Sequence, residues 1–392
     1  MNASITGAQS TLSADDEAQL REVVSGIVAG FGHEYFARKS ATGERATELW
    51  QALADGGFVG ANIPEEYGGV GMGLTALSIV AEEAAAAGCP LIMLIISPAI
   101  VGSVLARHGS PEQKDRWLRL IGTGAGKLAF AVTEPDAGSN SHRIATTARR
   151  EGDHYVLNGS KVFISALDEA EALLVVARTG TDDGTGRGRL SLFVVDADCP
   201  GLQRQEMPMT LHMPDAQYAV FFDDVIVPAD RLVGDEGSGL RAVFDGLNPE
   251  RVIIGSISAG IGRYAMRKAV KYANERRVWD TPIGQHQGIA HPLAEAQIHL
   301  DAARVMIRRA ASLYDSGADA GAASNMAKFL AAEASIRCLD QAIEVHGGSG
   351  FSADVGLADM LTLARLFKTV PITREMILNY VAEHTLGLPK SY

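Results

Sequence analysis

The ten residues from Phe130 to Ser139, FAVTEPDAGS, combine residue types that can hold a flat or anionic ligand. The apolar residues at the start of this stretch are expected to end a short strand, which Pro135 stops before the chain turns. Small, turn-forming residues let backbone N–H groups approach a ligand closely, and Thr133 and Ser139 add hydroxyl groups. These residue types alone are equally compatible with an ordinary surface turn.

The segment Leu247-Asn248-Pro249-Glu250-Arg251 places a carboxylate beside a guanidinium group. Asn248 suits an N-cap and Pro249 suits the first helical position, so a helix is expected to begin here. Glu250 would then lie in the first turn, where the helix dipole favours a negative charge. A solvated helix start explains the same residues, so this pattern by itself does not select a catalytic role.

Composition narrows the classes of function. The 392 residues include 47 acidic and 35 basic side chains, a net charge of −12, which argues against nucleic-acid binding and for a cytoplasmic protein. No secretory signal opens the chain, and no apolar stretch of about 18 residues could span a membrane. Cys89, Cys199 and Cys338 are far apart and lack histidines at ligand spacing, so neither disulfides nor a metal site are expected.

The hydrophobic pattern predicts an α+β fold of three domains: an N-terminal helical domain over 1–126, a central antiparallel β domain over 127–236 and a C-terminal helical bundle over 237–392. In the β domain, two successive hairpins are expected, the second turning at Asn158-Gly159. In the bundle, four long antiparallel helices are expected. The first starts at Asn248, and the other three run over about 288–314, 320–345 and 357–384.

Several motifs resemble signatures of the acyl-CoA dehydrogenase family. FAVTEPDAGS resembles the family's TEPGAGSD, and LNGSKVFIS at 157–165 resembles LNGxKxWITN. Further along, 273–280 resembles AxERxxFG, and 344–350 resembles QxxGGxG. The resemblance implies an FAD-dependent enzyme of fatty acid metabolism that converts an acyl-CoA to the trans-2-enoyl-CoA. It also implies a homotetramer that passes electrons to an electron-transfer flavoprotein.

The resemblance assigns FAD-binding roles to residues of these motifs and of the C-terminal segment. Phe163 stands where an indole usually stacks on the flavin, and Arg276 stands where an arginine meets the FAD pyrophosphate of a neighbouring subunit. The cofactor-binding residues implied are Phe130, Val132, Thr133, Gly138, Ser139, Phe163, Ile164, Ser165, Arg276, Trp279, His286, Gln287, Glu344, Val345, Gly347, Gly348, Thr373 and Glu375.

The resemblance also directs attention to the catalytic base. Most relatives carry a glutamate in an EGTSEI-like stretch, and counting from the QxxGGxG motif places that position on Pro371. A second branch, typified by isovaleryl-CoA and long-chain acyl-CoA dehydrogenases, carries its glutamate in an LxxER setting, which 247–251 matches. Glu250 is therefore assigned as the base that removes the α-proton, with Ser139, Asn248 and Arg251 binding the substrate.

Pro371 also removes a hydrogen-bond donor. In the family, the backbone N–H at this position donates to the thioester carbonyl, and proline has none. Ile372 or a shifted turn could supply the donor, or a ribityl hydroxyl of FAD could act alone. Two other functions stay open on the same scaffold: a non-catalytic flavin-binding or assembly subunit, and a flavin monooxygenase. Acyl chain length and the choice between CoA and a carrier protein are not readable from the sequence.

Overall fold

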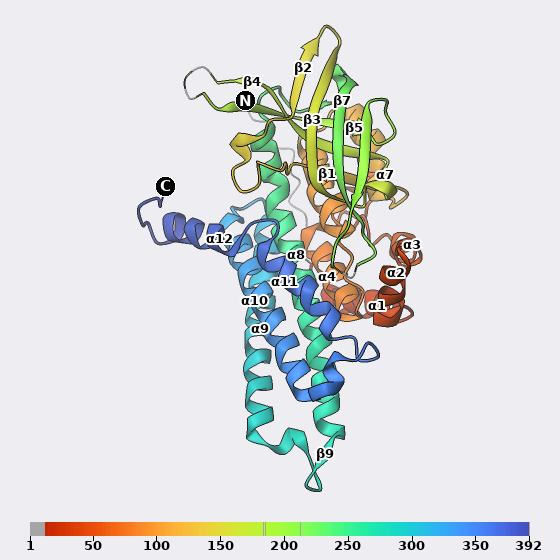
Figure 1. Ribbon diagram of the computed structural model, residues 1–392, viewed down its shortest axis with the longest axis vertical. Helices are drawn as coiled ribbons and strands as arrows, with labels where there is room; N and C mark the ends of the chain where they lie inside the picture. The colour runs from red at the N-terminus through yellow and green to blue at the C-terminus, as the bar shows by residue number, and fades with distance from the viewer. Residues whose placement is uncertain (1–11, 183, 185, 212, 392) are drawn as a thin grey trace.

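A computed structural model describes residues 12–182, 184, 186–211 and 213–391. Along its long axis, the sheet lies at one end and the helical bundle extends from it to the other end (Figure 1). The first residues of the predicted N-terminal domain lie outside the described residues. Among the residues described, no helix combines the length and apolar character needed to cross a membrane.

The N-terminal part is helical, as the sequence predicts. Ser13 and Ser110 cap two of its helices: each hydroxyl accepts a hydrogen bond from the backbone N–H three residues later, and the side chain at that later position bonds back to the cap. All residues of α4 are buried, because its alanines allow close packing on every side. The segments are α1 (Ala14–Val28), α2 (Gly32–Thr42), α3 (Thr47–Asp55), α4 (Gly73–Ala86), the π-helical η2 (Ile95–Gly102), α5 (Ser103–His108), α6 (Pro111–Gln113), the π-helical η3 (Lys114–Leu118) and α7 (Arg119–Gly122).

The central part is a sheet with the strand order β6-β7-β3-β2-β4-β5-β8, in which β1 pairs with β4. Its pairings are antiparallel except that β4 runs parallel to β1 and to β2. The strands are β1 (Leu128–Ala131), β2 (Thr147–Glu151), β3 (His154–Ser165), β4 (Ala172–Thr181), β5 (Gly188–Asp196), β6 (Leu202–Met207), β7 (Gln217–Pro228) and β8 (Leu232–Val233).

The second hairpin predicted at Asn158-Gly159 is wrong. Strand β3 continues through these residues, and its register with β7 shifts there, as in a β-bulge. Gly159 has a φ of 147°, and a Cβ at this position would lie 2.6 Å from Cα of Thr146. The glycine is needed because the backbone near Thr146 approaches it closely. In the sequence, a glycine that serves close packing looks the same as one that serves a hairpin turn.

The C-terminal part is a bundle led by α8 (Gly239–Glu275), and the helix start predicted at Asn248 is wrong. Pro249 lies inside α8, where it cannot donate to the carbonyl of Asp245. The Tyr314 hydroxyl lies 3.5 Å from that carbonyl oxygen and donates to it instead. Helix α8 therefore continues across a residue pair that locally resembles a start.

The other helices of the bundle are α9 (Gln287–Asp315), α10 (Gly321–His346), α11 (Ala358–Thr369) and α12 (Arg374–Tyr380). The single helix predicted over 357–384 is divided between α11 and α12. The two are joined by 370–373, which contains the cis peptide bond Val370–Pro371. A proline there ends α11, because it lacks an N–H group and disfavours helical geometry in the residue before it.

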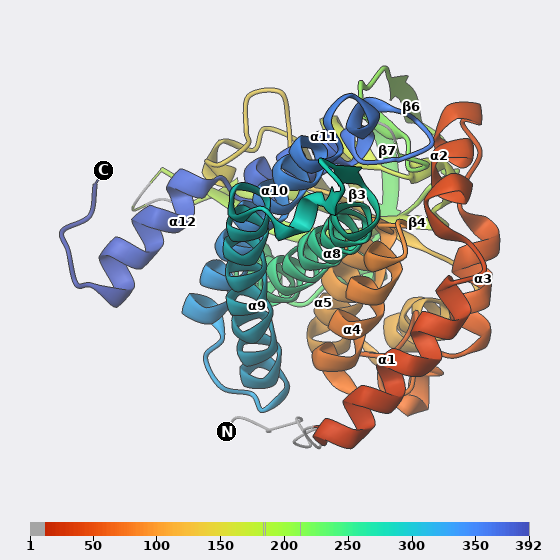
Figure 2. The ribbon, with the colours of Figure 1, turned by 90° about the horizontal axis from the view of Figure 1, so that it is seen from below.

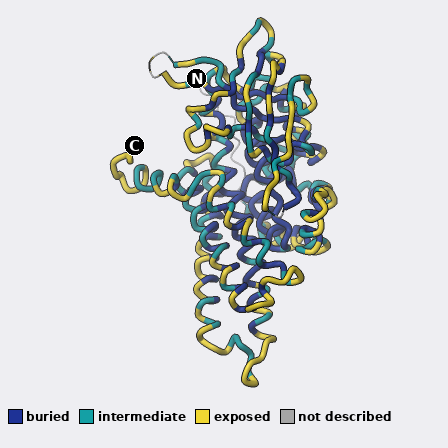
Figure 3. The backbone as a smooth tube through the Cα atoms, viewed as in Figure 1, coloured by how far each residue is buried: buried dark blue, intermediate teal, exposed yellow. Residues whose placement is uncertain are grey.

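Helix α8 ties the parts together. It begins against β5, where a Cβ on Gly239 would lie 2.6 Å from Cα of Ser191, and seen from below it lies among α4, α9 and α10 (Figure 2). Buried apolar side chains of α1, α4, α8, α9, α10 and α11 form one core. Burial is densest where these helices meet the sheet, whereas the opposite end of the bundle is largely exposed (Figure 3).

Candidate active site

Glu250 lies on a buried stretch of α8. Its side chain is 8% exposed, and its Oε2 atom has no hydrogen-bond partner among the described residues. Glycines of α8 on either side allow this close packing: a Cβ on Gly246 would lie 3.0 Å from the Ile100 carbonyl oxygen, and one on Gly255 would lie 3.2 Å from Ile307. Because Glu250 lies inside α8 and not in its first turn, the helix dipole does not account for a carboxylate at this position.

Burial raises the pKa of Glu250 to about 8, although the positive charges of Arg251 and Lys328 oppose the rise. A desolvated carboxyl group with a free oxygen and a pKa near the working pH has the properties of a general base. This environment is compatible with the predicted base, although Glu250 lies inside α8 and not at a helix start; its catalytic role stays a prediction.

Asn248 and Arg251, two of the predicted substrate-binding residues, lie beside each other. The Nη1 atom of Arg251 donates to Oδ1 of Asn248 at 3.0 Å, while its buried Nε atom has no partner within the described chain. Tyr380 of α12 lies near enough to affect the charge of Arg251. Ser139, the third predicted residue, is exposed in the loop after β1, and the structure gives no contact between it and this pair.

Lys328 of α10 is a site residue that the sequence reasoning missed. Its Nζ atom donates to the Ile372 carbonyl at 2.7 Å and lies 3.4 Å from the Lys368 carbonyl oxygen. The lysine therefore connects the bundle to the segment that carries Pro371 and Thr373. Thr373 caps α12, since its hydroxyl accepts from the Met376 N–H at 3.3 Å.

The loop after β1 is anchored by a buried ion pair. Glu134 accepts hydrogen bonds from the backbone N–H groups of Ala145 at 2.6 Å and Thr146 at 2.9 Å, and from Lys161 Nζ at 2.9 Å. Lys161 also donates to the Val132 carbonyl at 3.0 Å, and burial lowers its pKa to about 8. The two charged residues hold the predicted ligand loop against β3.

Phe163 lies within β3 beside this loop, where the register between β3 and β7 shifts. Its φ is 59°, an unusual value for an aromatic residue, and its side chain is 54% exposed. The Thr133 carbonyl accepts a hydrogen bond from the Val162 N–H at 2.9 Å, which keeps the loop next to this register shift. Ile164 is buried in the sheet core, so only its backbone could contact a ligand. Ser165 is held by Gln217, to which its hydroxyl donates at 3.0 Å.

A third group of predicted residues gathers at the far end of the bundle, away from the sheet (Figure 1). The rings of Tyr272 and His346 stack 4.3 Å apart, which places the ends of α8 and α10 together. Strands β9 (Arg277–Val278) and β10 (Thr281–Pro282) form a hairpin there, and Trp279 at its turn is 88% exposed. This group comprises Arg276, Trp279, His286, Gln287, Glu344, Val345, Gly347 and Gly348.

Within one chain, therefore, the structure does not bring this third group to Phe163. Val345 is buried, whereas Glu344, Gly347 and Gly348 are exposed at the end of α10. Thr373 and Glu375 belong with Glu250 instead, because the Ile372 carbonyl is bound by Lys328 and the charge of Glu375 acts on the same lysine.

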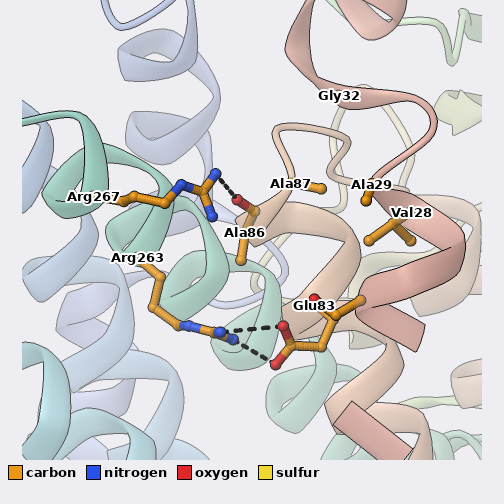
Figure 4. A pocket seen from close by; sticks show the side chains of 9 residues that line it. Val28, Ala29, Gly32, Glu83, Ala86, Ala87, Arg263 and Arg267 are labelled. Carbon is orange, nitrogen blue, oxygen red and sulfur yellow. Dashed lines mark hydrogen bonds and ion pairs between the residues drawn. The ribbon is translucent and has the colours of Figure 1, made fainter. Parts of the chain in front are cut away.

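A separate cavity of about 290 Å³ lies between α1, α4 and α8, and its described lining includes none of the predicted site residues. Figure 4 shows its polar groups paired with one another: Arg263 binds Glu83 at 2.6 Å, and Arg267 donates to the Ala86 carbonyl at 2.7 Å. Because these groups are already satisfied, the cavity offers no evident recognition chemistry.

Solved structures share this fold over nearly the whole chain. The complex of glutaryl-coenzyme A dehydrogenase with glutaryl-CoA is 29% identical, has a TM-score of 0.90, and each chain is covered to 97%. PigA with FAD and proline is 25% identical and has a TM-score of 0.90. The match covers 99% of the PigA chain and 97% of this chain. The chain therefore has the acyl-CoA dehydrogenase fold.

The sequence comparisons agree with that fold. The acyl-CoA dehydrogenase N-terminal, middle and C-terminal domains match residues 14–125, 129–225 and 237–386. Acyl-CoA dehydrogenase FadE12 of Mycobacterium tuberculosis is 49% identical over 98% of this chain and 99% of its own length. The caffeyl-CoA reductase-Etf complex subunit CarC of Acetobacterium woodii is 34% identical over 83% and 86%. The chain belongs to the acyl-CoA dehydrogenase family.

The protein is accordingly an oxidoreductase acting on acyl-CoA, and FAD is its cofactor. The residues present fit a flavin: an exposed aromatic ring at Phe163 lies beside an anchored loop. A Cβ built on Gly138 in that loop would meet no other atom within 4 Å. Neighbouring residues therefore leave the surface at Gly138 uncovered, next to the place where the family resemblance predicts the flavin.

The raised pKa of Glu250 predicts a pH-dependent stability. The folded carboxyl group stays neutral up to a pH of about 8, whereas the unfolded one ionises above its ordinary pKa of 4.5, so the fold loses stability as the pH rises through this interval. We expect the difference in unfolding free energy between Glu250→Gln and the wild-type protein to shift in favour of the variant by on the order of 4 kcal/mol between pH 5 and pH 8.5. Urea unfolding at both pH values measures this, and a pH-independent difference would contradict the burial of an ionisable group.

Proposed function

We propose that the protein removes the α-proton of an acyl-CoA with Glu250 and releases the trans-2-enoyl-CoA. The observation that carries this proposal is the buried Glu250 carboxyl group with one unpartnered oxygen. A thioester α-proton is only weakly acidic, so its removal needs a desolvated base and stabilisation of the developing enolate oxygen. When bound, FAD supplies the hydride acceptor at flavin N5.

Each part of the site has a defined role in this proposal. Phe163 supports the flavin ring, and the Glu134–Lys161 pair holds the loop that carries Ser139. Asn248 fixes the Arg251 guanidinium beside Glu250, where it lines the thioester pocket. Pro371 offers no N–H to the thioester oxygen, so the donor is assigned to the neighbouring turn over 372–373 or to a ribityl hydroxyl.

The test is an anaerobic screen of acyl-CoA thioesters of different chain length and branching. We expect at least one to bleach the flavin absorbance and to yield the 2-enoyl product. Absence of bleaching with every thioester would support a non-catalytic or assembly subunit. NADH-dependent oxygen consumption with flavin reduction would support a monooxygenase. The same screen with carrier-protein thioesters distinguishes the two carriers.

Assembly and electron transfer form a second part of the proposal: a cytoplasmic homotetramer that delivers electrons to an electron-transfer flavoprotein. Large apolar side chains are exposed on the bundle, as expected for a surface covered by another subunit: Trp279, Ile298, Val305 and Phe351. The Arg276 group, remote from Phe163 in one chain, would then bind the FAD of a neighbouring subunit.

We therefore expect Arg276→Gln to weaken FAD binding by about 10- to 100-fold, the usual cost of losing a hydrogen bond to a charged group. FAD titration of the apoprotein, with sedimentation to record the oligomeric state, measures the effect. Arg365→Gln is the matched control, since this arginine bonds the Thr369 hydroxyl of its own helix. Equal FAD affinity in both variants would contradict the role of Arg276.

A further inference from the structure

We propose that Lys328 is a positioning residue for proton abstraction: it fastens the turn over 370–373 to α10 and places a positive charge beside the Glu250 carboxylate. This inference rests on the proposed function. It assigns a role to a residue whose recorded hydrogen bonds go to backbone carbonyls and not to Glu250. Two independent features of the site support it.

The first feature is a mechanical connection. Lys328 is 1% exposed, and its ammonium group bonds the Ile372 carbonyl at 2.7 Å and approaches the Lys368 carbonyl at the end of α11. In a trans peptide, the carbonyl and the following N–H point in opposite directions. Binding the Ile372 carbonyl therefore turns the Thr373 N–H away from Lys328. Lys328 thus sets the orientation of the turn that has lost a donor at Pro371.

The second feature is electrostatic. The charged groups that act on Lys328 come from the helices around it: Glu250 and Arg251 of α8, Glu375 of α12 and Glu333 of α10 itself. Burial lowers the pKa of Lys328 to about 8, and Glu250 is the largest influence in the opposite direction. Reciprocally, the charge of Lys328 lowers the pKa of Glu250. The two residues therefore stabilise each other's charged forms inside the bundle.

A purely structural role predicts something different. If Lys328 only closed the end of α11, a change at this residue would alter stability and leave the titration of the base unchanged. A buried lysine carries a desolvation cost, which an apolar side chain of similar length would avoid. The pH dependence of turnover separates the two roles, because it reports the ionisation of the base.

The experiment compares Lys328→Met and Lys328→Arg with the wild-type holoenzyme, using the thioester that bleaches the flavin fastest. We expect the acid limb of the kcat/KM profile to move up by about one pH unit in Lys328→Met, the low end of the effect of a nearby opposite charge. The rate at pH 7 would fall about 10-fold. Lys328→Arg is expected to retain the wild-type limb. Lys271→Met, which removes an exposed lysine of α8, is the control.

Hydrogen exchange provides a readout that does not depend on turnover. Amides of 372–380 are expected to exchange faster in Lys328→Met and at the wild-type rate in Lys328→Arg. If Lys328→Met does not fold, Lys328→Gln keeps a neutral donor while removing the charge, and the same shift of the acid limb is expected. A wild-type profile in the folded neutral variant would overturn the proposal.

The outcomes separate this inference from the proposed function. If no thioester reduces the flavin of the wild-type protein, the dehydrogenase function itself fails. If the wild-type protein is active and Glu250→Gln is not, while the neutral Lys328 variant keeps the wild-type pH profile, the function stands and the role of Lys328 is rejected.

Discussion

Glu250→Gln is expected to lower the rate of flavin reduction by an acyl-CoA about 10³-fold, within the usual range for losing a general base. Glutamine has nearly the same shape as glutamate, so the packing of α8 around Gly246 and Gly255 should persist. FAD should also remain bound, because the unpartnered Oε2 atom of Glu250 holds none of the residues proposed to bind it. Stopped-flow spectroscopy under anaerobic conditions measures the rate, and the flavin spectrum measures occupancy.

A matched substitution separates this effect from a general loss of charge. Glu295 of α9 is exposed and pairs with Arg337 at the surface, so Glu295→Gln is expected to keep the wild-type rate, as surface pairs contribute little. A Glu250→Gln variant that reduced flavin within about 3-fold of wild type, against the ~10²-fold minimum expected for a base, would remove Glu250 from the mechanism.

Lys161→Met is expected to destabilise the protein by about 3 kcal/mol, because breaking a buried ion pair leaves an uncompensated charge. Glu134 would keep its two backbone donors, from Ala145 and Thr146, so the cost should fall at the low end of the range for such pairs. The Val132 carbonyl would also lose its bond to Lys161. We therefore expect weaker FAD retention together with the lower stability.

Urea unfolding at a fixed protein concentration measures the stability, and the ratio of flavin to protein absorbance measures retention. Lys271→Met again serves as the control for loss of one lysine. A cost below about 1 kcal/mol, the level of an exposed pair, would show that the Glu134–Lys161 pair does not anchor the loop.

The sequence predicted the fold class well because its signals are periodic. Apolar residues recur at helical spacing in the N-terminal part and in the bundle, and they alternate with polar residues in the sheet. Both patterns arise because each helix buries one stripe and each strand buries one face. Local signals for helix starts and turns were less reliable. Asn248-Pro249 suits a helix start, yet α8 begins at Gly239 and continues through this pair. Asn158-Gly159 suits a hairpin turn, yet it lies within β3. In both cases tertiary packing overrides a short-range preference.

The candidate site was predictable where motifs carried it. Glu250 was found through its neighbours in the chain, and its burial, which supplies the base-like pKa, appears only when α8, η2 and α10 are packed together. Lys328 had no comparable signal. A single lysine in an apolar helix can also extend its ammonium group to solvent, and only the distant Ile372 carbonyl shows that this one does not.

The residue roles and the domain boundaries at 126–127 and 236–237 stay predictions. The separation of the Arg276 group from Phe163 is a further result that motifs do not provide, since order along the chain does not reveal whether two motifs meet within one subunit. FAD titration of the Arg276 variant addresses that division directly.

The proton-transfer step itself can be isolated with an acyl-CoA in which oxygen replaces the β-methylene group, because this thioester has α-hydrogens and no β-hydride to lose. In deuterated buffer, the wild-type holoenzyme is expected to exchange the α-hydrogens of this compound, as followed by mass spectrometry. Glu250→Gln, with FAD bound, is expected to show no exchange above the uncatalysed rate. Exchange by Glu250→Gln at the wild-type rate would contradict the assignment of Glu250 as the base.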